Sequence, residues 1–138
     1  MLGNADSRQE IQGGLTLDAI QSIASAVQRD GISDVVTGFG VLNEPFQDCD
    51  MTVVRDYNDK ALSLIRSTLG NEMSIYIGDL FNSTLWQDDW WDDVPNTYLD
   101  SHYYHVFAEK PRALSPRQHI AYVCRKNARD TDALQTTT

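Results

Sequence analysis

The stretch Val41-Leu42-Asn43-Glu44-Pro45 decides how this 138-residue chain is expected to fold. It ends an apolar run whose residue types favour a buried strand over residues 35–42. Pro45 has no backbone N–H and disfavours helix at the residue before it, so the strand is expected to end here. Parallel α/β sheets and barrels place their chemistry at the carboxyl ends of strands. The sequence therefore predicts an amide and a carboxyl at such an end, with a polar turn leaving the core as the alternative.

Two amphipathic segments flank this strand. Apolar residues at helical spacing predict helices over residues 17–30, with Thr16 as N-cap, and over residues 52–69. Gly31 and Gly70 are the expected C-caps of the two helices. The second helix is expected to bury a stripe made of Val53, Val54, Tyr57, Ala61, Leu64, Ile65 and Thr68.

Further elements follow along the chain. Residue types that favour strands predict two more, over residues 73–77 and 98–103. Ser115-Pro116-Arg117-Gln118 predicts a helix start with a capping box, and that helix is expected to run to about Lys126. Alternation of helix and strand is typical of an α/β fold with a parallel sheet.

The rest of the chain is divided by its composition. Residues 1–15 are polar and glycine-containing and are expected to be loop, and residues 129–138 are expected to be a disordered tail. Residues 16–128 are then one domain. Within the first strand, Gly38 and Gly40 suit either a close approach of a neighbouring backbone or a locally loose strand.

The charge balance excludes several classes of partner. The net charge is −9 and the isoelectric point about 4.5, which argues against nucleic acid or an anionic membrane as partner and suits a neutral ligand such as a sugar. No apolar run approaches the roughly 20 residues of a membrane span, and residues 1–14 do not resemble a signal peptide. Cys49 and Cys124 are too few for a disulfide framework; they pair with each other, pair elsewhere or stay reduced.

Polar and aromatic side chains follow each of the three predicted strands. They are Asn43 and Glu44 after the first, Asp79 and Phe81 after the second, and His102, Tyr104 and Phe107 in and after the third. Neighbouring parallel strands lie about 4.8 Å apart, so these groups are expected to converge on one crevice if the strands are neighbours in sequence order.

Glu44 is the best candidate for chemistry, because it alone among the four glutamates follows an apolar strand. A carboxyl against an apolar wall has a raised pKa and can donate a proton to a leaving oxygen. Asn43 is either a ligand for a sugar hydroxyl or a turn former before proline. His102 and Tyr104 share one face of their strand, either to orient a substrate or as the polar tips of half-buried rings.

Two other groups of residues are weaker candidates. His105 and His119 have no partner at metal-ligand spacing, so no metal site is expected. The aspartates and tryptophans of residues 86–93 form a calcium loop, a sugar-stacking platform or, as the spacing favours, a solvated acidic face.

These residues resemble a known family. Leu42-Asn43-Glu44-Pro45, the run from His102 to Phe107, and the segment from Leu114 to Cys124 are similar to the exo-β-1,3-glucanases of glycoside hydrolase family five. The similarity extends over about residues 16–125. It implies a (β/α)₈ TIM barrel and a retaining hydrolase that needs no cofactor or metal. Its partner would be a β-glucan oligosaccharide or polysaccharide, with no nucleic acid or membrane partner, and it would be a monomer when complete, located outside the cell or in the cell wall.

The resemblance also implies roles for individual residues. Glu44 matches the general acid/base, Asn43 the ligand of the sugar 2-hydroxyl, and His102 and Tyr104 the lining of the sugar subsite. Phe107 matches one residue of an aromatic clamp, and Phe81 matches another less closely. The cysteine that matches Cys124 pairs in relatives with one further along the chain.

The sequence departs from the family at one catalytic position. Retaining hydrolysis needs a second carboxylate about 5–5.5 Å from the first, and no glutamate follows Glu109 here. The chain therefore resembles roughly strands four to six of the barrel, and alone it is expected to be poorly stable and inactive. Two alternatives remain: a non-catalytic carbohydrate-binding fragment that uses Trp86, Trp90, Phe81 and Phe107, or a small α/β domain without a sugar role.

Overall fold

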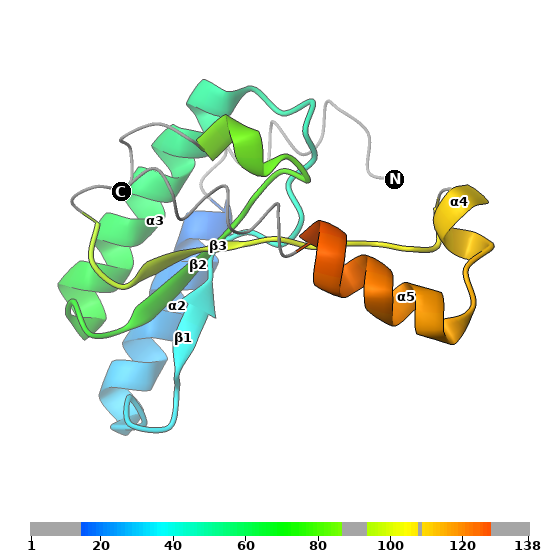
Figure 1. The fold of residues 1–138 in the computed structure, drawn as a ribbon. Coiled ribbons are helices and arrows are strands. Elements are labelled where there is room, and N and C mark those ends of the chain that lie inside the picture. The colour runs from blue at the N-terminus through cyan, green and yellow to red at the C-terminus, as the bar shows by residue number, and fades with distance from the viewer. Residues whose placement is uncertain (1–14, 87–93, 108, 128–138) are drawn as a thin grey trace.

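The structure is a computed structural model that describes residues 15–86, 94–107 and 109–127. The predicted N-terminal loop lies almost entirely outside the described residues, and the predicted tail entirely so. In chain order the elements are α2 (Leu15–Asp30), β1 (Gly38–Gly40), α3 (Met51–Leu69), β2 (Ser74–Gly78), the 3-10 helix η1 (Ser83–Trp86), β3 (Thr97–Asp100), α4 (Glu109–Arg112), α5 (Pro116–Tyr122) and the π-helical turn η3 (Val123–Asn127) (Figure 1).

The three strands form one parallel sheet in the order β1-β2-β3. Gly40 is paired with Tyr76, and Gly78 with Asp100, so the carboxyl ends of the strands meet at one edge. The predicted parallel α/β arrangement, with strands neighbouring in sequence order, is confirmed for these strands. The partial barrel over residues 16–128 stays a prediction.

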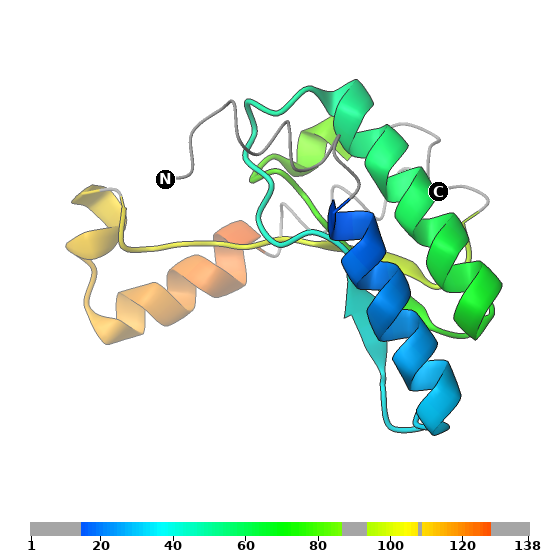
Figure 2. The same cartoon turned by 180° about the vertical axis from the view of Figure 1, so that it is seen from behind.

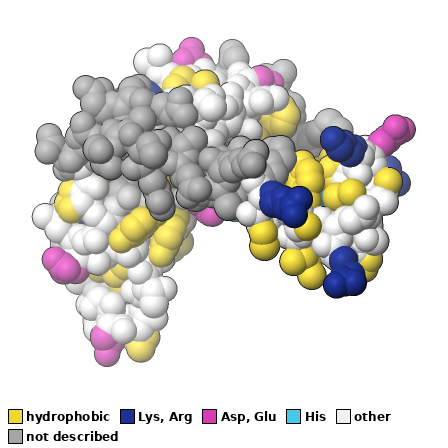
Figure 3. All heavy atoms as spheres, viewed as in Figure 1, with side chains coloured by type: hydrophobic (Ala, Val, Ile, Leu, Met, Phe, Trp, Pro, Cys, Tyr) yellow, Lys and Arg dark blue, Asp and Glu magenta, His cyan; other side chains and the backbone are white. Residues whose placement is uncertain are grey.

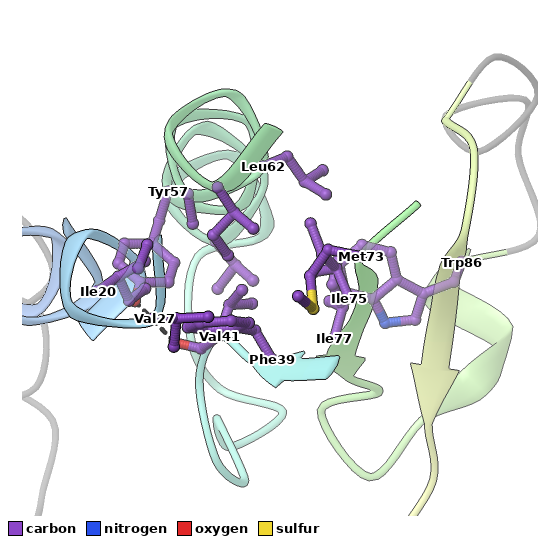
Figure 4. Packing of buried hydrophobic residues seen from close by; sticks show 14 of the residues in the cluster. Ile20, Val27, Phe39, Val41, Tyr57, Leu62, Met73, Ile75, Ile77 and Trp86 are labelled. Carbon is purple, nitrogen blue, oxygen red and sulfur yellow. Dashed lines mark hydrogen bonds between the residues drawn. The ribbon is translucent and has the colours of Figure 1, made fainter. Parts of the chain in front are cut away.

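Helices α2 and α3 lie side by side across one face of the sheet (Figures 1 and 2). Side chains from both helices and from β1 and β2 meet between the layers (Figure 4). This core consists of Ile20, Ala24, Val27, Phe39, Val41, Val54, Tyr57, Ala61, Leu62, Ile65, Met73, Ile75, Ile77, Leu80 and Trp86. On β2 the burial alternates, with Ile75 and Ile77 in the core and Tyr76 exposed, as a strand's period of two requires.

The helix ends follow their local chemistry. The prediction of Thr16 as N-cap is wrong, because α2 already includes Leu15. At the other end Gly31 has a φ of 64°, and the N–H groups of Gly31 and Ile32 bond to the carbonyls of Gln28 and Val27. This is the Schellman pattern, so Gly31 is confirmed as the C-cap.

The bounds of helix α3 agree with the prediction to within one residue. It ends at Gly70, whose φ is 83°, and begins after Asp50, whose carboxylate accepts a hydrogen bond from the Thr52 N–H at 2.9 Å. Four residues of the predicted stripe are buried, whereas Val53, Leu64 and Thr68 are half-buried. Asn58 and Leu62 are buried although the stripe omits them, and Leu62 belongs to the core that α3 shares with α2 and the sheet.

The first and third strands are shorter than predicted, whereas β2 has the predicted length and is shifted by one residue. The backbone N–H groups of Val35 and Val36 bond to the Ile32 carbonyl, so these residues belong to a turn and β1 begins only at Gly38. β3 begins at Thr97 and ends at Asp100, and residues 101–107, here called the arm, leave the sheet. Strand ends depend on where a neighbouring strand offers hydrogen bonds, which residue types alone do not specify.

The arm leads to α4 and α5, which lie away from the sheet and from the layer formed by α2 and α3 (Figures 1 and 2). Glu109, for which the sequence analysis predicts no helix, begins α4. The predicted capping box is confirmed, since the Gln118 side-chain oxygen accepts a hydrogen bond from the Ser115 N–H at 2.8 Å. α5 is shorter than predicted and continues as the π-helical turn η3.

Helix α5 has no buried residue, and hydrophobic side chains gather on this end of the molecule (Figure 3). Ile120 and Val123 are exposed, as are Val106 and Phe107 of the arm. Both cysteines are free thiols, so Cys49 and Cys124 do not pair with each other. Among the described helices, none has the length and apolar character needed to cross a membrane.

Candidate functional site

Two contacts hold the segment from Val41 to Pro45, which carries Glu44, against the rest of the fold. The buried Tyr57 hydroxyl donates a hydrogen bond to the Val41 carbonyl at 2.8 Å, and burial raises the pKa of Tyr57 to about 12. Pro45 is buried against β2, where a Cβ added to Gly78 would lie 2.7 Å from the Pro45 Cδ. A side chain at position 78 would therefore displace the turn. This close approach makes glycine necessary at the end of β2.

The two glycines of β1 differ in the space that an added Cβ would find. A Cβ at Gly38 would lie 2.8 Å from the Ser74 carbonyl oxygen and 2.7 Å from the Tyr76 ring, so the predicted close approach is confirmed there. At Gly40 nothing lies within 4 Å of an added Cβ, so of the two alternatives a close approach does not hold for that residue. The neighbouring strand comes close only to the first glycine.

Glu44 lies at the centre of a cluster of polar groups. Its backbone has a φ of 48°, which is unusual for a residue other than glycine. Its carboxylate oxygen Oε1 lies 2.6 Å from the His102 Nδ1 and accepts a hydrogen bond from the Tyr104 hydroxyl. The predicted convergence of Glu44, His102 and Tyr104 is thus present in the structure, although 58 and 60 residues separate them in the chain.

These contacts stabilise the ionised form of Glu44. The hydrogen bond from Tyr104 is the main cause that lowers the pKa of Glu44, followed by the hydrogen bond from His102. The same bond raises the pKa of Tyr104, because losing its proton would place a second negative charge beside the carboxylate. The expected raised pKa is therefore wrong for this structure. Hydrogen-bond donors surround the carboxylate where the sequence predicted an apolar wall.

His102 lies between two carboxylates. Its Nδ1 faces Glu44, and its Nε2 lies 3.2 Å from the Oδ2 of Asp100. The pKa of His102 is raised, first by the hydrogen bond to Glu44 and then by the one to Asp100. Only the protonated imidazole can donate a hydrogen bond to both carboxylates, which is why the two contacts favour the charged form of His102.

The end of β2 forms the floor of the site. The Asp79 Oδ1 accepts a hydrogen bond from the Phe81 N–H at 2.8 Å, and Leu80 and Phe81 have φ values of 59° and 57°. This turn buries Asp79 and directs the chain away from the sheet. A small hollow here is lined by Glu44, Gly78, Asp79, Phe81, Asp100 and His102.

A row of aromatic rings lies beside this hollow. The centroids of Phe46 and Phe81 are 5.9 Å apart, those of Phe81 and Tyr104 are 6.1 Å apart, and those of Tyr104 and Phe107 are 5.3 Å apart. Phe46, Tyr104 and Phe107 are exposed, with Phe107 80% accessible. Exposed rings beside polar groups can stack on a ligand that has apolar faces and polar edges, such as a sugar.

Other candidates from the sequence lie elsewhere. Asn43 is exposed and does not line the hollow. Trp86 is only 2% exposed, so its expected role as a stacking platform is wrong. Trp90 and the aspartates of residues 88–93 lie outside the described residues. No group of three potential metal ligands occurs in the part of the chain that the structure describes.

Two residues of the site were missed by the sequence analysis. Asp100 is two residues before His102, and this spacing of two places side chains on one face of an extended chain. Phe46 directly follows Pro45, and an aromatic residue next to a predicted site was a usable signal; its ring is exposed in the structure. His105 and His119, which have no partner at metal-ligand spacing in the sequence, contact each other in the structure, with their Nδ1 atoms 3.3 Å apart.

Comparison with known proteins gives two related sequences. The chain is 31% identical over 120 residues to a glucan 1,3-beta-glucosidase of Candida oleophila, a match that covers 80% of this chain and 28% of that protein. It is 29% identical over 100 residues to a glucan 1,3-beta-glucosidase of Kluyveromyces lactis, covering 70% and 23% respectively. The chain thus spans about a quarter of the length of the curated relatives it matches. No protein-family model matches it.

These similarities support a glucanase-like relationship and suggest a glycoside hydrolase lineage. The contacts of Glu44, His102 and Tyr104 are a second observation, independent of these similarities. The relatives are named for their action on a 1,3-β-glucan. The structure adds a cluster of ionisable side chains beside aromatic rings.

Proposed function

We propose that this chain supplies the proton-transferring part of a β-1,3-glucan hydrolase site, with Glu44 as general acid and base. The observation that carries the proposal is the contact of Glu44 with His102 and Tyr104 at the carboxyl edge of a parallel sheet. Similarity to two glucan 1,3-beta-glucosidases supports the choice of substrate. The parallel sheet of neighbouring strands, with α2 and α3 packed on one face, suits a segment of a TIM barrel of glycoside hydrolase family five.

The chemistry assigned to Glu44 requires it to change protonation state. In the open site its carboxylate is ionised, which is the form that accepts a proton from water. A bound glucan would exclude water and favour the protonated form, which donates its proton to the departing glycosidic oxygen. In a retaining reaction a second carboxylate attacks the anomeric carbon, and a water molecule, deprotonated by Glu44, later releases glucose. We assign that second carboxylate to no described residue.

Other residues bind the sugar in this proposal. His102 and Tyr104 line the subsite and hold the Glu44 carboxylate in place. Phe81 and Phe107 stack on the faces of the sugar rings. Asn43, which lies outside the hollow, hydrogen-bonds the 2-hydroxyl of a sugar that extends beyond it. No cofactor or metal takes part, the complete protein is a monomer, and it works outside the cell or in the cell wall.

The test is hydrolysis of β-1,3-glucan by the protein that contains this chain. Glu44→Gln should lower turnover of unactivated glucan by about 10²–10⁴-fold, the usual contribution of general acid–base catalysis. It should affect an aryl glucoside much less in the first step, because that leaving group departs without a proton. Glu72→Gln is the matched control, because Glu72 is exposed and lies outside the site. Retained turnover of glucan by Glu44→Gln would remove Glu44 from this role.

A non-catalytic carbohydrate-binding role is the second candidate, favoured by the row of exposed rings. It predicts affinity for β-1,3-glucan without hydrolysis, and loss of that affinity in Phe107→Ala. The remaining alternative is an α/β domain without a sugar role. Glu44 turned outward, far from His102, would favour it, whereas the two side chains lie 2.6 Å apart.

A further inference from the structure

A second pair of titratable side chains lies outside the glucanase-like site, where the arm meets α5. His105 comes from the arm, and His119 from the middle of α5, 14 residues later. Tyr122 is three residues after His119 and therefore lies on the same face of the helix. Its ring meets the His105 ring edge-on, with centroids 4.9 Å apart and an angle of 87°. His105 is thus held against one face of α5 by two side chains.

The two imidazoles face each other through their nitrogens. Their Nδ1 atoms are 3.3 Å apart, whereas the ring centroids are 5.4 Å apart and the planes differ by 15°. Rings that overlapped face to face would have closer centroids, so these rings meet along their nitrogen-bearing edges. Without a third group between them, one nitrogen must donate a proton to the other, because two facing lone pairs repel.

We propose that His105 and His119 form a binding site for a divalent transition-metal ion of the Zn²⁺ type. Zinc binds imidazole nitrogen at about 2.0–2.1 Å with tetrahedral angles, which places two ligand nitrogens about 3.3–3.4 Å apart. The Nδ1 atoms are already 3.3 Å apart. Both rings are half-buried, so a metal ion reaches them from solvent while the rings stay oriented.

The chemistry of binding follows from the pair. The metal ion takes the place of the proton between the nitrogens, and both imidazoles then carry their N–H at Nε2. Neutral imidazole is a preferred ligand of zinc, copper and nickel ions, whereas Mg²⁺ prefers oxygen. Two protein ligands leave two tetrahedral positions for water or another donor, since no third potential ligand joins the pair among the described residues. Such a site is exchangeable, and it fastens α5 to the arm.

The chain offers a matched control because it has only three histidines, and His102 is the third. We suggest calorimetric titration of the 138-residue chain with ZnCl₂ at neutral pH, with MgCl₂ as the second probe. One Zn²⁺ should bind per chain and Mg²⁺ should not bind at this site. His105→Gln and His119→Gln should each weaken Zn²⁺ binding by at least about tenfold, and His102→Gln should leave it within about twofold.

A second measurement needs no variant. Paramagnetic Ni²⁺ added to the wild-type chain should broaden the imidazole NMR signals of His105 and His119 at concentrations that leave His102 unchanged. The proposal is overturned if the wild-type chain binds no Zn²⁺, if His105→Gln binds it as tightly as wild type, or if Ni²⁺ broadens His102 first. None of these results bears on glucan hydrolysis. The metal site of His105 and His119 and the proposed catalytic role of Glu44 can therefore be refuted independently of each other.

Discussion

Replacing Gly78 by alanine should disturb the site through the backbone, without touching any of its polar groups. The new Cβ would lie 2.7 Å from the Pro45 Cδ and 3.2 Å from the Leu42 carbonyl oxygen. Restoring an ordinary contact of at least 3.4 Å requires the turn to move by about 0.7 Å. Both neighbours belong to backbone or a proline ring, so neither can rotate away. Glu44 lies between them and must move with the turn.

The expected magnitude follows from overpacking in a tight contact. Gly78→Ala should lower the free energy of unfolding by about 1–3 kcal/mol, measured by urea denaturation. It should also weaken the contact between Glu44 and His102, so the pKa of His102, measured by NMR, should fall toward its ordinary value of 6.5. In an active protein a displacement of this size should reduce turnover by up to about a hundredfold.

Gly40→Ala is the control for this experiment. It makes the same chemical change at the end of the neighbouring strand, but nothing lies within 4 Å of the added Cβ. Its stability should equal or exceed that of wild type by up to about 1 kcal/mol, because alanine restricts the unfolded chain. If Gly78→Ala is as stable as Gly40→Ala and His102 titrates as in wild type, the close contact with Pro45 does not position the site.

Two further predictions concern the same edge of the sheet. Tyr57→Phe should lower the free energy of unfolding by about 1–3 kcal/mol, because it leaves the buried Val41 carbonyl without its donor; equal stability by thermal denaturation would contradict this. The ion pair of Glu44 and His102 should make its largest contribution to stability between pH 4.5 and 6.5. Because the pKa of His102 is raised in the folded state, the contribution of His102 is lost as the pH rises above this range. Because the pKa of Glu44 is lowered, the contribution of Glu44 is lost as the pH falls below it. Wild type compared with Glu44→Gln in denaturation across pH should show this window, and a constant difference would contradict it.

The helices were largely predictable from the sequence because their signals are local. Gly31 and Gly70 end α2 and α3 by adopting positive φ, and Gln118 caps α5, as their residue types predict. The parallel order of the strands was also predictable from the alternation of helix and strand. The ends of β1 and β3 were not, because they depend on hydrogen bonds between strands far apart in the sequence.

The members of the site were easier to predict than their electrostatics. Glu44, His102 and Tyr104 follow strand ends, so topology alone brings them near one another. The lowered pKa of Glu44 depends on the orientation of single hydrogen bonds, which residue spacing does not specify. The contact of His105 with His119 depends on how the arm leaves the sheet, and no local signal predicts that path.

The most direct test of the site is an NMR titration of the His102 imidazole in wild type, Glu44→Gln and Asp100→Asn. The account predicts a pKa above 6.5 in wild type, a large fall in Glu44→Gln and a smaller fall in Asp100→Asn, since the bond to Glu44 is the main cause of the shift. An unchanged His102 pKa in Glu44→Gln would show that the carboxylate and the imidazole do not meet, and would contradict the proposed site.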